Sequence, residues 1–213
     1  MPKSLFMGYI VPLSILVPIV TYSLKAKWAT DTLRLPFYFL ISSGLINLAA
    51  IIMIEKGKSN LPLLHLYTIV EATFFLLYFR SIFVNSAIKN TLTIAIFAFP
   101  IFCIINFVFL QSIFTYNTYT RPLEAIIITI ACLTYFYKSG FSENWLSSPV
   151  NWINMGILIY FPAATIIFIL SNYFTFVKLH RELVHLIWNI HAFLVLMMYL
   201  FWTKGFSLMK KNG

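Results

Sequence analysis

The chain has 213 residues and a formal net charge of +9; 61% of its residues are hydrophobic and 10% are charged. A soluble domain carries about 25% charged residues, so this composition excludes an ordinary water-soluble fold. The basic residues are scattered among short connections instead of forming one patch, which argues against nucleic acid as a partner. Cys103 and Cys132 lie in apolar stretches, so no disulfide framework is expected.

Seven apolar segments fill nearly all of the chain. Each has close to the roughly 20 residues that an α-helix needs to cross the hydrocarbon core of a bilayer. The sequence therefore predicts an all-α fold, a polytopic transmembrane bundle of seven helices that forms a single domain over residues 1–213. The predicted spans are residues 5–24, 35–54, 61–80, 91–111, 122–137, 151–173 and 183–203.

The first span follows Met1-Pro2-Lys3 and has no small-residue cleavage site at its end, so we expect it to be retained as a helix. Charged runs at 25–28 and 55–58 end the first and second spans, because such residues are costly inside lipid. Prolines inside the first, fourth and sixth spans predict kinked helices. These prolines are Pro12, Pro18, Pro100 and Pro162.

The third span carries the most informative polar residue. Glu71 lies near its middle, where an ionised carboxylate costs at least about 2.5 kcal/mol. On an ideal helix Tyr67, Thr68 and Tyr78 fall on the same side as Glu71, so we expect this polar stripe to face the bundle interior. Three roles stay open for the carboxyl group: a hydrogen bond between helices, a ligand, ion or proton site, or general acid–base chemistry.

The later spans add amide and histidine side chains. Glu124, in the first turn of the fifth span, is assigned no chemical role, because the helix dipole alone suits an anion there. Asn154 lies on a polar side of the sixth span. In the seventh span His185 and Asn189 are four residues apart and share one face, whereas His191 points nearly the opposite way.

His185 and Asn189 are candidates to share a polar cavity with Glu71, in which the imidazole stabilises the carboxylate or exchanges a proton with it. The alternative is hydrogen bonding between helices near the membrane boundary. The histidines at the start of this span are five residues apart and lack the i, i+4 pair that places two imidazoles on one metal ion. We therefore predict no metal site and no cofactor.

The distribution of charge predicts an orientation. Nine of the 15 Lys and Arg residues lie on the side of the C-terminus and six on the opposite side. By the positive-inside rule, the C-terminus is expected in the cytoplasm and the N-terminus outside. The protein is thus expected to be a multi-pass protein of the cell membrane that contacts membrane lipid.

Three segments carry a resemblance to a known group of proteins: Tyr67-Thr68-Ile69-Val70-Glu71, Tyr116-Asn117-Thr118-Tyr119 and Trp152-Ile153-Asn154-Met155-Gly156-Ile157-Leu158-Ile159-Tyr160-Phe161. Over most of its length the chain resembles small seven-helix integral membrane proteins of bacteria, including the sensor modules that precede histidine kinases. The resemblance implies a bacterial inner membrane. Because this chain stops at Gly213, an output domain is expected on another polypeptide.

The expected function is that of a receptor-like or regulatory module. A small apolar ligand, a lipid or the membrane state would shift the packing of the helices and signal through a membrane or cytoplasmic partner. The first alternative is a membrane-embedded lipid-modifying enzyme similar to lysoplasmalogenase-like hydrolases, with Glu71 and His185 as acid–base candidates. The second is a small-solute transporter, although no internal repeat is visible. No complete catalytic motif is present, so enzymatic activity stays open.

Overall fold

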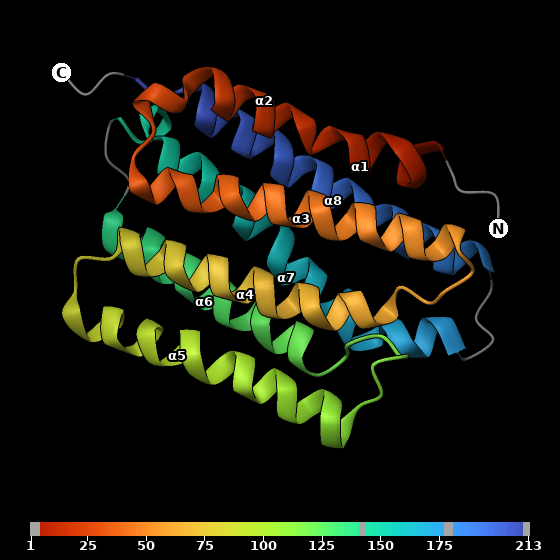
Figure 1. Ribbon diagram of the computed structural model, residues 1–213. Coiled ribbons are helices and arrows are strands. Elements are labelled where there is room, and N and C mark those ends of the chain that lie inside the picture. Colours follow the sequence, from red (N-terminus) through yellow and green to blue (C-terminus); the bar gives the residue numbers. More distant parts are fainter. Residues whose placement is uncertain (1–4, 141–143, 177–180, 211–213) are drawn as a thin grey trace.

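The computed structural model describes residues 5–140, 144–176 and 181–210. Met1-Pro2-Lys3 and Gly213 lie outside these ranges. In the described part, an all-helical bundle without strands confirms the predicted all-α class (Figure 1). The elements are η1 (Phe6–Ile10), α1 (Val11–Ser14), α2 (Leu16–Lys25), η2 (Ala26–Trp28), α3 (Asp31–Glu55), α4 (Leu61–Ile82), α5 (Ser86–Ile105), η3 (Asn106–Leu110), α6 (Thr120–Ser139), η4 (Trp145–Ser147), α7 (Pro149–Phe176) and α8 (Arg181–Ser207).

Six of the seven long helical segments in the described chain are long and apolar enough to cross a membrane. These are Phe6–Trp28, Asp31–Glu55, Leu61–Ile82, Ser86–Leu110, Pro149–Phe174 and Glu182–Ser207. The exception is α6, which contains Arg121, Glu124 and Lys138 and packs against α4 and α7. The chain therefore fits a multi-pass membrane protein, in which neighbouring helices shelter one more polar helix.

The first predicted span is not one regular helix. It is interrupted at Ile15, between Pro12 and Pro18, where proline removes a backbone donor and its ring crowds the preceding turn. By contrast, α5 and α7 continue through Pro100 and Pro162.

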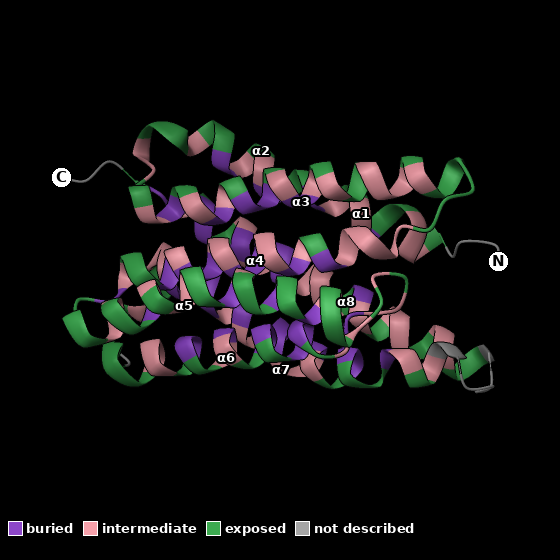
Figure 2. Cartoon of the chain, turned by 60° about the horizontal axis from the view of Figure 1, so that its bottom comes forward, coloured by how far each residue is buried: buried purple, intermediate pink, exposed green. Residues whose placement is uncertain are grey.

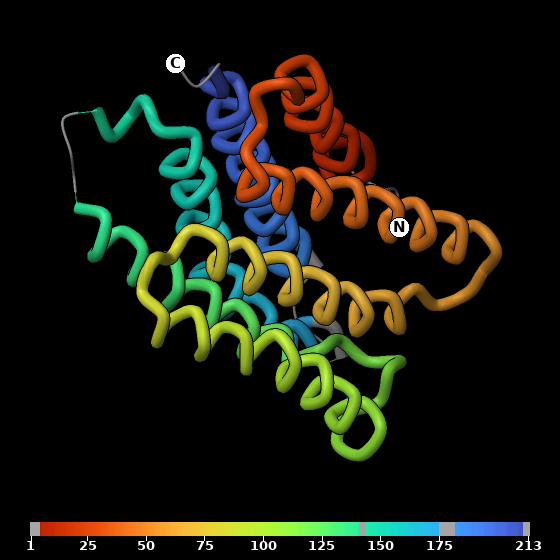
Figure 3. Tube along the Cα trace, turned by 60° about the vertical axis from the view of Figure 1, so that its left-hand side comes forward, coloured from red at the N-terminus to blue at the C-terminus, as the bar shows by residue number. Residues whose placement is uncertain are grey.

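The last helix returns to the first. Successive long helices run in opposite directions, and α8 lies between α7 and the α1–α2 segment, so the two ends of the chain pack together in the fold (Figures 1 and 3). The start of η1 and the end of α8 lie at opposite ends of the bundle (Figure 1). The odd number of long helices accounts for this placement.

Large apolar side chains cover the outside of the bundle. Leu45, Phe97 and Ile130 are each more than half exposed, and buried residues are concentrated where the helices face one another (Figure 2). A soluble protein would hide such residues, because each exposed large side chain forfeits roughly 1.5–3 kcal/mol of burial. This outer surface suits the hydrocarbon of a bilayer.

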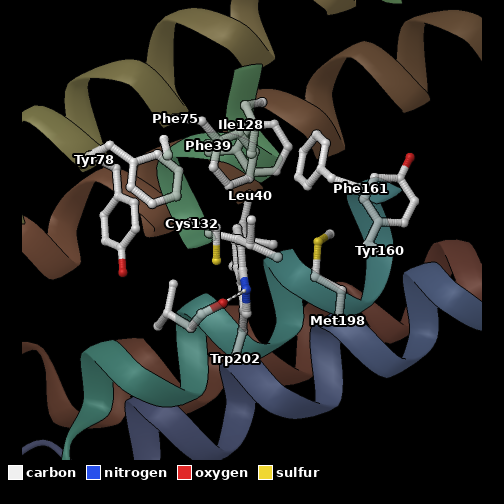
Figure 4. Close-up of a cluster of buried hydrophobic side chains, with 14 of the residues drawn as sticks. Phe39, Leu40, Phe75, Tyr78, Ile128, Cys132, Tyr160, Phe161, Met198 and Trp202 are labelled. Carbon is white, nitrogen blue, oxygen red and sulfur yellow. Dashed lines mark hydrogen bonds between the residues drawn. The ribbon is translucent and has the colours of Figure 1, made fainter. Parts of the chain in front are cut away.

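An aromatic core closes one half of the bundle. Phe39 of α3, Phe75 of α4 and Trp202 of α8 meet with ring centroids 5.0–5.9 Å apart, and Phe161 of α7 contacts Phe75 edge to face (Figure 4). The Trp202 indole is buried and donates a hydrogen bond to the Ile153 carbonyl. This half, which contains the start of α7 and the end of α8, is tightly filled with side chains.

We expect Gly156→Ala to destabilise the protein. A Cβ at Gly156 would lie 2.8 Å from Cδ1 of Trp202 and 3.1 Å from the carbonyl oxygen of Met198. Such overpacking typically costs about 1–3 kcal/mol. Gly44→Ala is the matched control, because its Cβ would have Ile15 Cδ1 as nearest atom at 4.0 Å. Thermal unfolding in mild detergent measures both variants. Equal melting temperatures of Gly156→Ala and Gly44→Ala would contradict the close contact of Gly156 with Trp202.

Candidate functional site

Glu71 is buried at the centre of α4 and is only 1% exposed. Its Oε2 forms an ion pair with Nη1 of Arg121, in the first turn of α6. Its Oε1 accepts a hydrogen bond from the Tyr67 hydroxyl at 3.3 Å. An ionised carboxylate at this depth requires a partner, and Arg121 supplies it across 50 residues of sequence.

The same guanidinium holds a second carboxylate. Nη1 of Arg121 lies 2.9 Å from Oε2 of Glu124, one turn further along α6. Both side chains of this second pair are buried. The guanidinium also stacks over the rings of Tyr67 and Phe168, with its central carbon 5.1 and 4.9 Å from the ring centroids. We name Glu71, Arg121 and Glu124 the charged cluster.

A chain of hydrogen bonds extends from the charged cluster through five helices. Ser43 bonds to the Tyr67 hydroxyl at 3.2 Å, and Nη2 of Arg121 donates to the Tyr160 hydroxyl at 3.2 Å. The Tyr160 hydroxyl in turn bonds to Nε2 of His191 at 3.1 Å. The members are Ser43 of α3, Tyr67 and Glu71 of α4, Arg121 and Glu124 of α6, Tyr160 of α7 and His191 of α8.

Beside this chain lies a cavity of about 580 Å³, within the range of roughly 300–1,000 Å³ typical of sites for small ligands. Its walls come from η1, α1, α3, α4, α6, α7, α8 and the connection before α6, in the half of the bundle opposite the aromatic core. Its polar inner end includes Ser43, Tyr67, Arg121, Tyr160, His191 and Tyr199. Much of the remaining wall is apolar, including Val11, Ile46, Ile51, Ile54, Leu64 and Val195.

Three of the predicted site residues lie on the cavity wall: Tyr67, Thr68 and His185. Glu71 is reached through Arg121 and Tyr67. Thr68 accepts a hydrogen bond from the Asn117 amide at 3.1 Å. These residues bring the middle of α4, the start of α8 and the connection before α6 to one place.

Tyr78 and Asn154 lie elsewhere. The Asn154 amide donates to the Tyr78 hydroxyl at 3.1 Å, and the Cys132 thiol contacts the Asn154 backbone carbonyl at 3.2 Å. This group belongs to the half of the bundle with the aromatic core, and neither Tyr78 nor Asn154 lines the cavity. Asn189 is half-buried and also lies outside the lining. These three residues therefore have no contact with the cavity that the structure describes.

The proposed pairing of Glu71 with His185 is not what the structure shows. Glu71 instead pairs with Arg121 and Tyr67, and the histidine that joins the hydrogen-bonded chain is His191. His191 was expected on the side of the helix nearly opposite His185 and Asn189 and was left out of the candidate site; that omission was wrong. Residues of α8 that line the cavity cover about 120° of an ideal helical wheel, so a narrow interior stripe was too strict an assumption.

Sequence reasoning therefore missed the roles of Arg121, Glu124, Tyr160 and His191. Arg121 was counted with the connection before the fifth predicted span, which starts at residue 122. In the structure α6 begins at Thr120, so Arg121 lies in its first turn. Glu124 was given no role, although it is buried against Arg121. For Arg121 and Glu124 the signal that could have found them is the Arg-x-x-Glu spacing around Pro122, since residues three apart share one helix face.

The chain matches no protein-family model, no curated protein and no solved structure. In the described residues, no group of three or more His, Cys, Asp or Glu side chains could hold a metal ion. The chemistry of the site therefore has to be argued from its hydrogen bonds, charges and shape.

Proposed function

We propose that this protein is a membrane-embedded binding module for a small amphiphile, and that the bound molecule regulates a partner protein. The observation that carries the proposal is the cavity, which combines extended apolar walls with a hydrogen-bonding inner end. Apolar walls suit an acyl or alkyl chain, and a few convergent polar groups fix the orientation of a ligand. Membrane lipid is the natural source of such a molecule.

The position of the hydrogen-bonded chain supports a regulatory role. Its members connect α3, α4, α6, α7 and α8, so a ligand that alters one bond at the inner end alters the packing of several helices. A ligand shifts a conformational equilibrium only by the difference in its affinity for the two states. The bundle surface or the connections would then transmit that shift to a membrane or cytoplasmic signalling partner.

The aromatic core makes binding a better proposal than passage through the bundle. Trp202, Phe75 and Phe161 are buried and in ring contact in the half beyond the inner end of the cavity, where they would obstruct a solute. The lipid-modifying alternative has less support, because the Glu71 carboxylate is held by Arg121 and Tyr67. A general base needs a carboxylate within reach of its substrate.

Filling the cavity should weaken binding. Ala50 of α3 lines the cavity, and we expect Ala50→Phe to weaken binding of a fluorescent single-chain lipid at least about tenfold, equivalent to 1.4 kcal/mol. Ala49→Phe is the matched control. Ala49 is the chain neighbour of Ala50 and is also half-buried, but it does not line the cavity. Titration in lipid nanodiscs measures both variants. Equal affinity in Ala50→Phe, Ala49→Phe and the native protein would overturn the proposed site.

A further inference from the structure

Resting on the proposed function, we infer that the polar end of the bound molecule is an uncharged group with a hydrogen-bond-accepting oxygen, as in a monoacylglycerol, and not an acid. A buried arginine facing a cavity ordinarily suggests a carboxylate or phosphate ligand. Here the balance of charge and the direction of the hydrogen bonds point the other way.

The positive charge of Arg121 is already compensated. Arg121 is the one charged side chain on the cavity wall within the described chain, and it pairs with both Glu71 and Glu124. With both carboxylates ionised, the charged cluster carries a net charge of −1; with one carboxyl protonated, it carries none. In neither state does the inner end attract an anion, and a buried charge without a partner is costly.

The guanidinium of Arg121 sets the direction of the first hydrogen bond in the chain. A guanidinium only donates, so the Tyr160 hydroxyl accepts from Arg121. We assign the Tyr160 hydrogen to His191 Nε2, the ring nitrogen that lies 3.1 Å from the hydroxyl oxygen. A neutral imidazole that accepts at Nε2 carries its hydrogen at Nδ1. In this tautomer the N–H at Nδ1 of His191, for which the described structure shows no hydrogen bond, is a donor available to a bound molecule, in addition to the guanidinium N–H groups of Arg121 that have no acceptor.

On the other side of the inner end, the direction of the hydrogen bonds at Tyr67 can be assigned in the same way. The Tyr67 hydroxyl donates to Glu71, so it accepts the hydrogen of Ser43. The carboxylates lie behind Arg121 and Tyr67 and do not line the cavity. The inner end thus presents the N–H donors of His191 and Arg121 beside hydroxyl groups, which suits an ester carbonyl or hydroxyl oxygen. The volume of about 580 Å³ suits one chain of a small ligand.

The test compares three probes that share a twelve-carbon chain: 1-dodecanoylglycerol, dodecanoate and dodecylamine. Binding to the native protein is titrated in nanodiscs of a zwitterionic lipid at pH 8, where dodecanoate is ionised. We expect the glyceride to bind most tightly. His191→Phe should weaken glyceride binding by roughly 3- to 10-fold, the effect of one hydrogen bond, and leave dodecanoate binding unchanged. His185→Phe is the control, because His185 lines the same cavity outside the hydrogen-bonded chain.

The outcomes separate this inference from the proposed function. If dodecanoate or dodecylamine binds more tightly than the glyceride, or if His191→Phe and His185→Phe change glyceride affinity equally, the inference is wrong while the binding function stands. If none of the three probes binds the native protein, or Ala50→Phe binds the glyceride like the native protein, the proposed function itself is wrong. A melting curve of His191→Phe that matches the native curve verifies that the variant folds.

Discussion

Arg121→Leu should lower the free energy of unfolding by about 3–5 kcal/mol, the usual effect of leaving buried carboxylates without their cation. Glu71 and Glu124 both depend on Nη1 of Arg121, and both are buried. Titration with SDS, followed by circular dichroism, measures the change. Arg80→Leu is the control, because Arg80, near the end of α4, is exposed and its Nε donates to Thr93 of α5. Such exposed polar contacts contribute about 0–1 kcal/mol.

A triple variant separates charge from shape. The combined substitutions Arg121→Met, Glu71→Leu and Glu124→Leu remove the cation and both carboxylates at once. Replacing a buried ion network with apolar groups of similar volume is often neutral or stabilising, so the triple variant should recover most of the stability lost in Arg121→Leu. Equal stability of Arg121→Leu and Arg80→Leu would show that the charged cluster does not hold the bundle together.

Trp202→Ala should cost about 3–5 kcal/mol, as expected for truncation of a buried tryptophan. The Trp202 side chain is among the largest that are wholly enclosed, and it contacts Phe39 and Phe75. Trp152→Ala is the control. Both indoles donate to a backbone carbonyl, that of Trp202 to Ile153 and that of Trp152 to Leu146. Trp152, however, is only half-buried.

Trp202→Phe divides this effect. Phenylalanine keeps most of the apolar contact and loses the hydrogen bond to the Ile153 carbonyl, which is typically worth about 0.5–1.5 kcal/mol. We therefore expect the order of stability to be native, then Trp202→Phe, then Trp202→Ala, measured by the same SDS titration. A loss in Trp202→Ala no greater than that in Trp152→Ala would mean that the aromatic core is not a main source of stability.

The sequence predicts the fold and the burial of Glu71 because both follow from the cost of polar groups in lipid. Apolar segments of about 20 residues have few alternatives to membrane helices. A mid-span carboxylate must face the interior, and Glu71 does. Local pattern is sufficient for these conclusions, since each depends on one helix and its solvent.

The partner of Glu71 depends on contacts between distant segments and is not encoded in a local pattern. Arg121 lies beside Pro122, where the sequence alone suggests a connection, but α4 and α7 shelter the start of α6 and bury the guanidinium. Tyr78 shows the second limit. It shares the interior face with Glu71 but lies seven residues further on, about 10 Å along the helix, and pairs with Asn154. A helical pattern predicts which face of the helix a side chain lies on, but not whether that side chain reaches the cavity at its position along the helix.

The claim that the cavity between α3 and α8 holds a single-chain amphiphile is tested most directly by photo-crosslinking. A monoacylglycerol with a diazirine in its chain is incorporated with the native protein into nanodiscs, irradiated, and the labelled peptides are mapped by mass spectrometry. We expect labels at cavity residues such as Ile51 and Val195, and their loss when excess 1-dodecanoylglycerol is present. Labels confined to outward residues such as Ile94 and Phe97, unaffected by competitor, would contradict the site.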